Sequence, residues 1–146
     1  MKNIYGLVPF KTFGVNAKAV IVISEKKKKV LIVDDEPDIC ILLSRKLIRK
    51  GLDAAYAVTL SDGLVQFNNT KPDFLILDHN LPDGLGLEHL DRFRAINPEA
   101  KIIVISAMGH LKEKAEEAGV DLFMSKPLTF KQIEDFIGIP TSTNPS

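Results

Sequence analysis

Hydrophobic positions along this chain fall into short continuous runs rather than into an alternating pattern. Continuous runs of this length are typical of strands that are buried on both faces, as in a parallel sheet. Four runs predict such strands: Lys29 to Val33, Asp73 to Leu77, Lys101 to Ile105 and Asp121 to Met124. A weaker run, Ala54 to Val58, predicts a further strand between the first two.

Helical patterns separate the predicted strands. Pro37 suits the first position of a helix, and Gly51 suits the end of that helix. Thr59 with Asp62, and Thr129 with Gln132, have the spacing of capping boxes and predict two more helix starts. Apolar residues at helical spacing predict the remaining two helices, around residues 87–94 and 111–118.

A strand followed by a helix thus occurs five times between about residues 29 and 138, which indicates an α/β fold with right-handed crossovers. Five units are too few for an eight-fold barrel. We therefore expect a doubly wound, five-stranded parallel sheet in the flavodoxin-like order 2-1-3-4-5, with helices on both faces. Residues 1–28 would be an N-terminal extension of unknown role, and residues 139–146 (IPTSTNPS) a disordered tail.

Composition narrows the choice of partners and location. The 146 residues favour one domain, and 45% of them are hydrophobic, enough for a core. The 19 basic and 19 acidic residues balance, so the whole chain offers no argument for binding nucleic acid or an anionic membrane. Cys40 is the single cysteine, and no apolar run has the length of a membrane span. A reducing, cytoplasmic setting is the simplest expectation.

Chemically active side chains follow four of the five predicted strands. Asp34 and Asp35 follow the first strand, Asp78 the third, Ser106 the fourth and Lys126 the fifth. Ligands of such sheets bind outside the carboxyl ends of the strands, where strand order reverses. Three carboxylates suit Mg²⁺, which would offset their mutual repulsion. A lysine and a hydroxyl suit phosphoryl oxygens, and an aspartate can be the nucleophile, so the set indicates phosphoryl transfer.

Each of these residues also has an ordinary structural explanation. Asp34 and Asp35 could solvate a strand end and favour a helix N-terminus, and Asp78 could be a turn residue. Ser106 and Lys126 taken singly carry almost no information. Their common position at the ends of successive strands favours a shared site.

Four stretches together resemble the response-regulator receiver domain of two-component signalling, in its single-domain, chemotaxis-regulator-like form. These stretches are VLIVDDEPD, PDFLILDHNLPDGLGLEHL, IIVISA and AGVDLFMSKPLT, and the resemblance covers about residues 29–138. It implies that Asp78 is the phosphoacceptor. It also implies that Mg²⁺ or Mn²⁺ is held by three carboxylates and one backbone carbonyl: Asp34, Asp35, Asp78 and the carbonyl of Asn80.

The resemblance assigns the remaining site residues as well. Ser106 would hydrogen-bond the phosphoryl group, and Lys126 would pair with its oxygens, next to a cis bond to Pro127. Phe123 falls at the aromatic switch position, where a tyrosine is frequent. The 20-residue spacing from Ser106 to Lys126 is short and predicts a trimmed loop or fourth helix.

The function implied is that of a signalling phosphoacceptor. A histidine kinase or histidine phosphotransfer protein would donate the phosphoryl group from a phosphohistidine. The surface of the fourth helix, fifth strand and fifth helix would then change and control a separate downstream effector, with room for a homodimer through the same surface. Such a domain catalyses only its own phosphorylation and dephosphorylation, so we do not expect an enzyme with a turnover substrate.

Two other classes of function remain open at this stage. One is a phosphorylation-independent docking module, which would have no need of the full set Asp35, Asp78, Ser106 and Lys126. The other is a Mg²⁺-dependent phosphatase with an aspartate nucleophile. Such phosphatases often carry a second acid two residues after the nucleophile, where this chain has Asn80.

Overall fold

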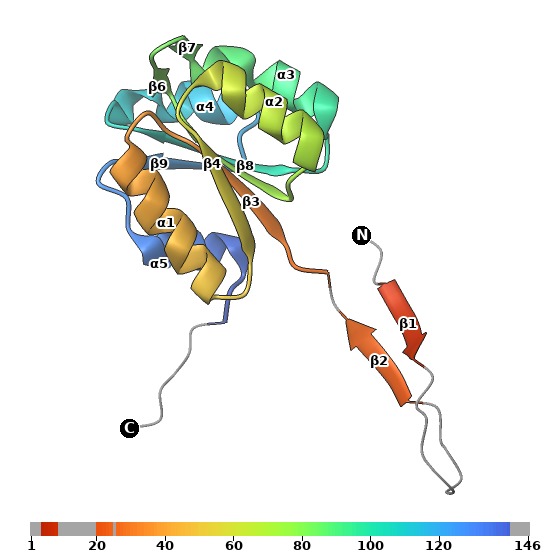
Figure 1. Cartoon of the computed structure of the whole chain (residues 1–146). Coiled ribbons are helices and arrows are strands. Elements are labelled where there is room, and N and C mark those ends of the chain that lie inside the picture. The colour runs from red at the N-terminus through yellow and green to blue at the C-terminus, as the bar shows by residue number, and fades with distance from the viewer. Residues whose placement is uncertain (1–3, 9–19, 25, 141–146) are drawn as a thin grey trace, which may run out of the picture.

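A five-stranded parallel sheet forms the centre of the computed structural model, which describes residues 4–8, 20–24 and 26–140 (Figure 1). Its order is β4-β3-β5-β8-β9. This order is 2-1-3-4-5 along the chain, so the predicted fold class is confirmed. The strands are β3 (Lys29–Val33), β4 (Asp53–Ala57), β5 (Phe74–Asp78), β8 (Lys101–Ser106) and β9 (Leu122–Ser125).

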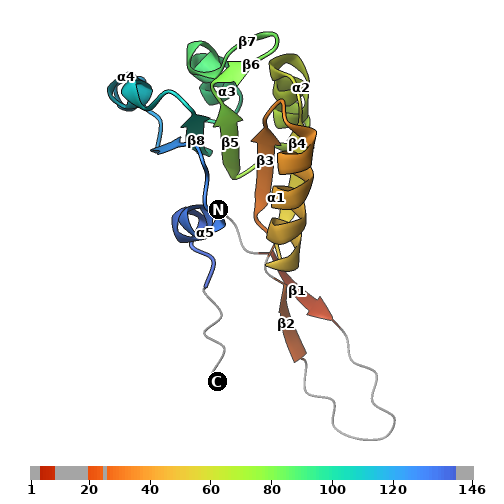
Figure 2. The ribbon, with the colours of Figure 1, turned by 90° about the vertical axis from the view of Figure 1, so that its left-hand side faces the viewer.

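Helices cover both faces of this sheet (Figures 1 and 2). Helices α1 (Pro37–Arg49) and α5 (Phe130–Ile137) lie on one face. The other face carries α2 (Leu60–Thr70), α3 (Leu90–Ile96) and the short α4 (Lys112–Glu117), the last two preceded by the 3₁₀ helices η1 (Gly86–His89) and η2 (Gly109–Leu111). The six residues of α4 agree with the expected trimmed fourth helix.

The two hydrophobic clusters explain why the strands are apolar at every position. Successive side chains of a strand point to opposite faces of its sheet. In β3, Val30 and Ile32 pack in the cluster that contains residues of α1 and α5. Leu31 and Val33 pack in the cluster that contains residues of α2, α3 and α4. Both sets need an apolar side chain, which removes the alternation expected of a half-exposed strand.

The N-terminal segment holds an element that the sequence analysis did not predict. Strands β1 (Ile4–Val8) and β2 (Val20–Ser24) pair antiparallel as a separate two-stranded sheet. The run of β-branched residues from Val20 to Ile23 favours extended backbone and accounts for the second strand. Within the predicted tail, residues 141–146 lie outside the described residues, and the predicted domain limits stay predictions. None of the described helices is long and apolar enough to cross a membrane.

The start of α2 is capped from two places in the sequence. Thr59 is the N-cap, and its hydroxyl accepts the backbone N–H of Asp62 at 3.1 Å, as the sequence predicted. The Asp83 carboxylate accepts the N–H groups of Leu60 and Ser61 at 2.7 and 2.8 Å. Asp83 lies between β6 (Asn80–Leu81) and β7 (Gly84–Leu85), which form a small antiparallel ladder. The loop that follows β5 is therefore tied to α2.

Replacing Asp83 with alanine should lower the melting temperature by a few degrees, because two N–H groups at the start of α2 lose their acceptor. The two N–H groups hold the pKa of Asp83 below its usual value. The Asp83 carboxylate therefore stabilises the fold at pH values above the ordinary pKa of an aspartate, and this contribution is lost as the pH falls through the lowered pKa.

Thermal melts of wild type and Asp83→Ala should differ at neutral pH and converge in acid. Asp91→Ala, on the first turn of α3, is the matched control. Equal melts for wild type and Asp83→Ala at neutral pH would contradict the capping role.

Candidate functional site

The loop after β3 holds one buried and two exposed acids. Asp34 is only 3% exposed, whereas Asp35 and Glu36 are exposed. The backbone N–H of Asp34 donates to the carbonyl of Ala57 at 3.1 Å, and its Oδ1 accepts the N–H of Glu36 at 2.9 Å. The Cys40 thiol donates to the carbonyl of Asp34 at 3.3 Å. These bonds fix the direction of Asp34 from both the sheet and α1.

Cys40 itself is a structural residue. It is buried in the core on the α1 side of the sheet. Burial, with a smaller contribution from the charge of Asp34, raises the pKa of its thiol to about 12. A thiol in this state is protonated at neutral pH and is a poor nucleophile.

Asp78 ends β5 at the same edge of the sheet, and its carboxylate is 2% exposed. Figure 2 shows β3, β5 and β8 ending at this edge. The Oδ1 atom of Asp78 accepts the backbone N–H of Asn80 at 3.2 Å, and its Oδ2 atom accepts a hydrogen bond from Lys126 Nζ at 3.1 Å. One oxygen is therefore held by the local turn, and the other faces a cation.

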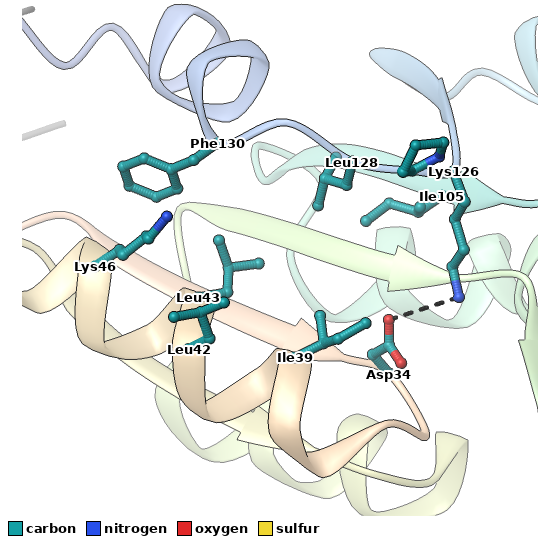
Figure 3. A pocket seen from close by; sticks show the side chains of 10 residues that line it. Asp34, Ile39, Leu42, Leu43, Lys46, Ile105, Lys126, Leu128 and Phe130 are labelled. Carbon is teal, nitrogen blue, oxygen red and sulfur yellow. Dashed lines mark ion pairs between the residues drawn. The ribbon is translucent and has the colours of Figure 1, made fainter.

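Lys126 reaches the acids from the loop between β9 and α5. Its Nζ lies 3.1 Å from Asp78 Oδ2 and 3.6 Å from Glu36 Oε1. It also lies 4.0 Å from Asp34 Oδ2, the pair that Figure 3 draws. Its backbone N–H donates to the carbonyl of Ser106 at 3.0 Å, which places the loop beside the end of β8. The Lys126–Pro127 peptide bond is cis, as predicted.

The charge of Lys126 does not fully offset the cost of burying the Asp34 and Asp78 carboxylates. Burial raises the pKa of Asp78 above its usual value, although the hydrogen bond and charge of Lys126 act in the opposite direction. Burial likewise raises the pKa of Asp34, with a further contribution from the charge of Asp78. For Lys126, burial lowers the pKa, but the hydrogen bond and charge of Asp78 outweigh it, so the pKa is raised. The lysine is less buried than the acids, so it stays charged at lower cost.

The acidic cluster has the composition of a magnesium site. One carboxylate oxygen from each of Asp34, Asp35 and Asp78 lies within 4.8 Å of the other two. Hard oxygen ligands with several carboxylates suit Mg²⁺, and Mn²⁺ accepts the same ligands. A divalent cation would also offset the burial that raises the pKa of Asp34 and Asp78. The residues present therefore fit the metal that the sequence predicted.

Ser106 lies on β8, the strand next to that of Asp78, and Phe123 lies on β9, one strand further along the sheet. Ser106 ends β8 and is fully buried, and its hydroxyl accepts the backbone N–H of Met108 at 3.0 Å. Phe123 lies on β9, is partly buried and packs against the cluster that contains residues of α2, α3 and α4. The structure thus brings together Asp34, Asp35, Asp78 and Lys126, and it places Ser106 and Asn80 in the adjoining segments.

Three features of the site were not found from the sequence. The buried His79 ring bonds to η1, Gly86 lies against the backbone of Asp78, and Asp83 caps α2. Burial, then the charge of Lys114, lowers the pKa of His79, so its ring is neutral at neutral pH. No local pattern reveals these roles, because each depends on a segment distant in sequence or on a close backbone approach.

A groove adjoins the acidic cluster (Figure 3). Its volume is about 560 Å³ and its walls are mostly apolar. The lining residues come from the loop after β3, from α1 and β8, and from the loop after β9 together with the start of α5: Asp34, Ile39, Leu42, Leu43, Lys46, Ile105, Lys126, Pro127, Leu128 and Phe130. Lys46 Nζ lies 5.3 Å from the centre of the Phe130 ring, across the groove. Asp34 and Lys126 therefore belong both to the groove and to the acidic site.

Comparison with known proteins agrees with this architecture. The family model described as response regulator receiver domain matches residues 30–137. The KDP operon transcriptional regulatory protein KdpE of Escherichia coli is 37% identical over 107 residues, which are 72% of this chain and 47% of KdpE. Sporulation initiation phosphotransferase F of Bacillus subtilis is 30% identical over 110 residues, which are 74% of this chain and 89% of that protein. The chain spans about half the length of several such relatives, KdpE and PrrA of Mycobacterium leprae among them.

Solved structures give the same result. A CheY-like receiver domain from Methanospirillum hungatei superposes with a TM-score of 0.72 at 27% identity, covering 77% of this chain and 92% of that one. The response regulator TrrA of Thermotoga maritima, solved in complex with Mg²⁺-BeF, superposes with a TM-score of 0.68 at 30% identity, covering 76% and 96%. The fold and the family match define the class: a receiver domain of two-component signal transduction. This chain belongs to the response regulator receiver domain family, whose members are signalling regulators rather than enzymes in general.

Proposed function

We propose that this domain accepts a phosphoryl group on Asp78 from a phosphohistidine of a histidine kinase or histidine phosphotransfer protein. The observation that carries the proposal is the buried Asp78 carboxylate, with a lysine ammonium 3.1 Å away and two further acids beside it. A buried carboxylate between a metal-binding set and a cation is suited to attack phosphorus and to be stabilised afterwards.

The chemistry requires one bond exchange. An O–P bond forms at a carboxylate oxygen of Asp78 as the P–N bond of the phosphohistidine breaks, and the electron pair stays on the partner's imidazole nitrogen. Mg²⁺, held by Asp34, Asp35, Asp78 and the Asn80 carbonyl, supplies charge neutralisation when bound. Lys126 shifts its hydrogen bond from Asp78 to a phosphoryl oxygen. Ser106 accepts from Met108, so its own hydroxyl proton is available to donate. The same site would later hydrolyse the acyl phosphate with water.

Signal output would follow from local rearrangement. Movement of Ser106 toward the phosphoryl group leaves space for the Phe123 ring to turn inward. The surface of α4, β9 and α5 then shifts between two populations and is recognised by a separate effector or by a second copy of the domain. In support, α4 has six residues, of which only Ala115 is buried, so few contacts oppose its displacement.

The test is intact mass after incubation with acetyl phosphate and Mg²⁺. The wild type should gain one phosphoryl group, whereas Asp78→Asn and a chelator-treated sample should gain none. Asp35→Asn should gain the group slowly, because one metal ligand is lost. An unlabelled wild type, under conditions that label a known receiver domain, would reject the proposal and favour the docking-module alternative.

We also propose that the groove beside Asp34 and Lys126 receives the phosphodonor protein. The groove continues directly into the acidic site, so a protein seated there would bring its phosphohistidine to Asp78. Leu42 of α1 lines the groove and is 58% exposed, as expected of an apolar residue that contacts a partner protein. A donor helix with an apolar stripe would bury Leu42 together with Leu128.

Leu42→Glu should therefore slow phosphoryl transfer from a protein donor by about tenfold or more, because it places a charge in an apolar contact. Labelling by acetyl phosphate should not change, since that donor needs no groove. Val65→Glu is the matched control, because Val65 is 56% exposed on α2, which lies on the other face of the sheet. Equal slowing with the protein donor and acetyl phosphate would place the defect in the acidic site and contradict this docking surface.

A further inference from the structure

His79, the residue directly after the phosphoacceptor, is buried and bonded in three directions. Its backbone N–H donates to the carbonyl of Ile105 at 2.9 Å, and its carbonyl accepts the N–H of Gly86 at 2.7 Å. Its ring Nδ1 accepts the N–H of Leu87 at 3.3 Å, and the residue is 4% exposed. His79 thus connects the end of β8 with the start of η1.

This residue is also the centre of the turn that directs the phosphoacceptor. Asp78 Oδ1 accepts the N–H of Asn80 at 3.2 Å, so the turn closes across His79. The other oxygen, Oδ2, then faces Lys126 Nζ at 3.1 Å. A change in the backbone angles of His79 would rotate the Asp78 carboxylate away from Lys126.

The hydrogen bond of the His79 ring satisfies a buried backbone N–H, that of Leu87. Leu87 is the second residue of η1, and the N–H groups in the first turn of a helix have no partner within it. Leu87 is itself buried, so water cannot replace the missing acceptor. The unprotonated Nδ1 of a neutral imidazole is the acceptor that is present. An apolar residue at position 79 would leave this buried N–H unpaired.

We propose that His79 is a positioning residue for the phosphoacceptor: its ring holds η1 against the Asp78–Asn80 turn and so fixes the direction of the Asp78 carboxylate. This inference rests on the proposed function of Asp78 as the acceptor. His79 does not touch the transferred group and acts through Asp78 alone.

Two substitutions separate the ring bond from the bulk of the side chain. His79→Asn places an amide oxygen near the position of Nδ1 and keeps an acceptor for Leu87, whereas His79→Leu fills the space without one. At saturating Mg²⁺ and acetyl phosphate, His79→Leu should be phosphorylated about tenfold more slowly than wild type, as expected for a small misplacement of a reacting group. His79→Asn should stay within about threefold of wild type. Rescue by asparagine would not follow if the side chain only filled space.

A second measurement on the wild type does not depend on how the variants fold. ¹⁵N NMR of the imidazole should show the proton on Nε2 and a bare Nδ1, and the Leu87 amide should exchange slowly with solvent. A proton on Nδ1, a leucine variant that labels as fast as wild type, or an asparagine variant as slow as the leucine one would each overturn the role of His79. A wild type that takes no phosphoryl group would instead overturn the proposed function of Asp78, and this inference with it.

Discussion

Replacing Gly86 with alanine is expected to lower the free energy of unfolding by about 3 kcal/mol, the upper part of the usual range for overpacking. An added Cβ would lie 2.6 Å from the carbonyl oxygen of Asp78, 3.1 Å from Leu77 Cγ and 3.2 Å from His79 Cα. Two of these three atoms belong to the backbone and cannot move aside as a flexible side chain would. The N–H of Gly86 also donates to the carbonyl of His79 at 2.7 Å, a bond that the displaced chain would lose.

Gly109→Ala is the matched control for this measurement. Gly109 begins η2 near the same edge of the sheet, and a Cβ there would meet only Ser125 Oγ, at an ordinary distance of 3.5 Å. Urea unfolding of Gly109→Ala should change the free energy of unfolding by less than about 0.5 kcal/mol. If Gly86→Ala gave the same small change, the loop after β5 would be free to move away from Asp78, contrary to the close contacts of Gly86.

The sequence predicted the sheet well because its information was local and repeated. The run from Lys29 to Val33 matches β3 in full, and the other predicted strands differ from the structure by one residue at either end. Each run is apolar for the same reason, namely cover by helices on both faces. The positions of Asp34, Asp78 and Lys126 followed from the sheet order, since parallel strands end at one edge.

Contacts between segments distant in sequence could not be predicted in the same way. Asp83 looks like a turn residue, yet its carboxylate caps a helix that begins 23 residues earlier, at Leu60. His79 looks like a polar residue near a site, yet its ring is buried and accepts a backbone N–H. Gly86 is one of two glycines in a short loop, and only the packing shows that it lies against Asp78. All three lie within residues 79–86, which connect Asp78 to α2 and η1.

The buried acids of the site carry an electrostatic cost. Burial is the main reason that the pKa of Asp34 lies above its ordinary value of 3.8. The folded protein therefore binds the Asp34 proton more tightly than the unfolded chain does, so stability declines as the pH rises from 3.8 through the raised value. Above that window the full cost of the buried charge is present. A residue of the same shape that cannot ionise would avoid this cost.

Asp34→Asn should accordingly stabilise the metal-free protein at neutral pH, by about 1 kcal/mol. The asparagine oxygen can still accept the N–H of Glu36, which the wild-type carboxylate accepts at 2.9 Å, so the start of α1 keeps this bond. The gain should shrink as the pH falls through the raised pKa of Asp34, because the wild-type carboxyl then becomes neutral as well. Urea unfolding in a chelating buffer, at neutral and acidic pH, measures both effects.

Magnesium should reverse the order of the two proteins. A metal that binds only the folded state at 100 times its Kd stabilises the wild type by about 2.7 kcal/mol. Asp34→Asn loses one of three clustered carboxylates and should gain little of this. Asp38→Asn, which replaces an exposed acid on the first turn of α1, should gain as much as wild type.

If Asp34→Asn were less stable than wild type without metal, the ion pairing of Asp34 with Lys126 would outweigh the cost of burying Asp34. If it gained as much from magnesium as wild type, the metal would bind elsewhere. The expected pair of results would show that the buried acids lower the stability of the metal-free protein and that the same acids bind the cation.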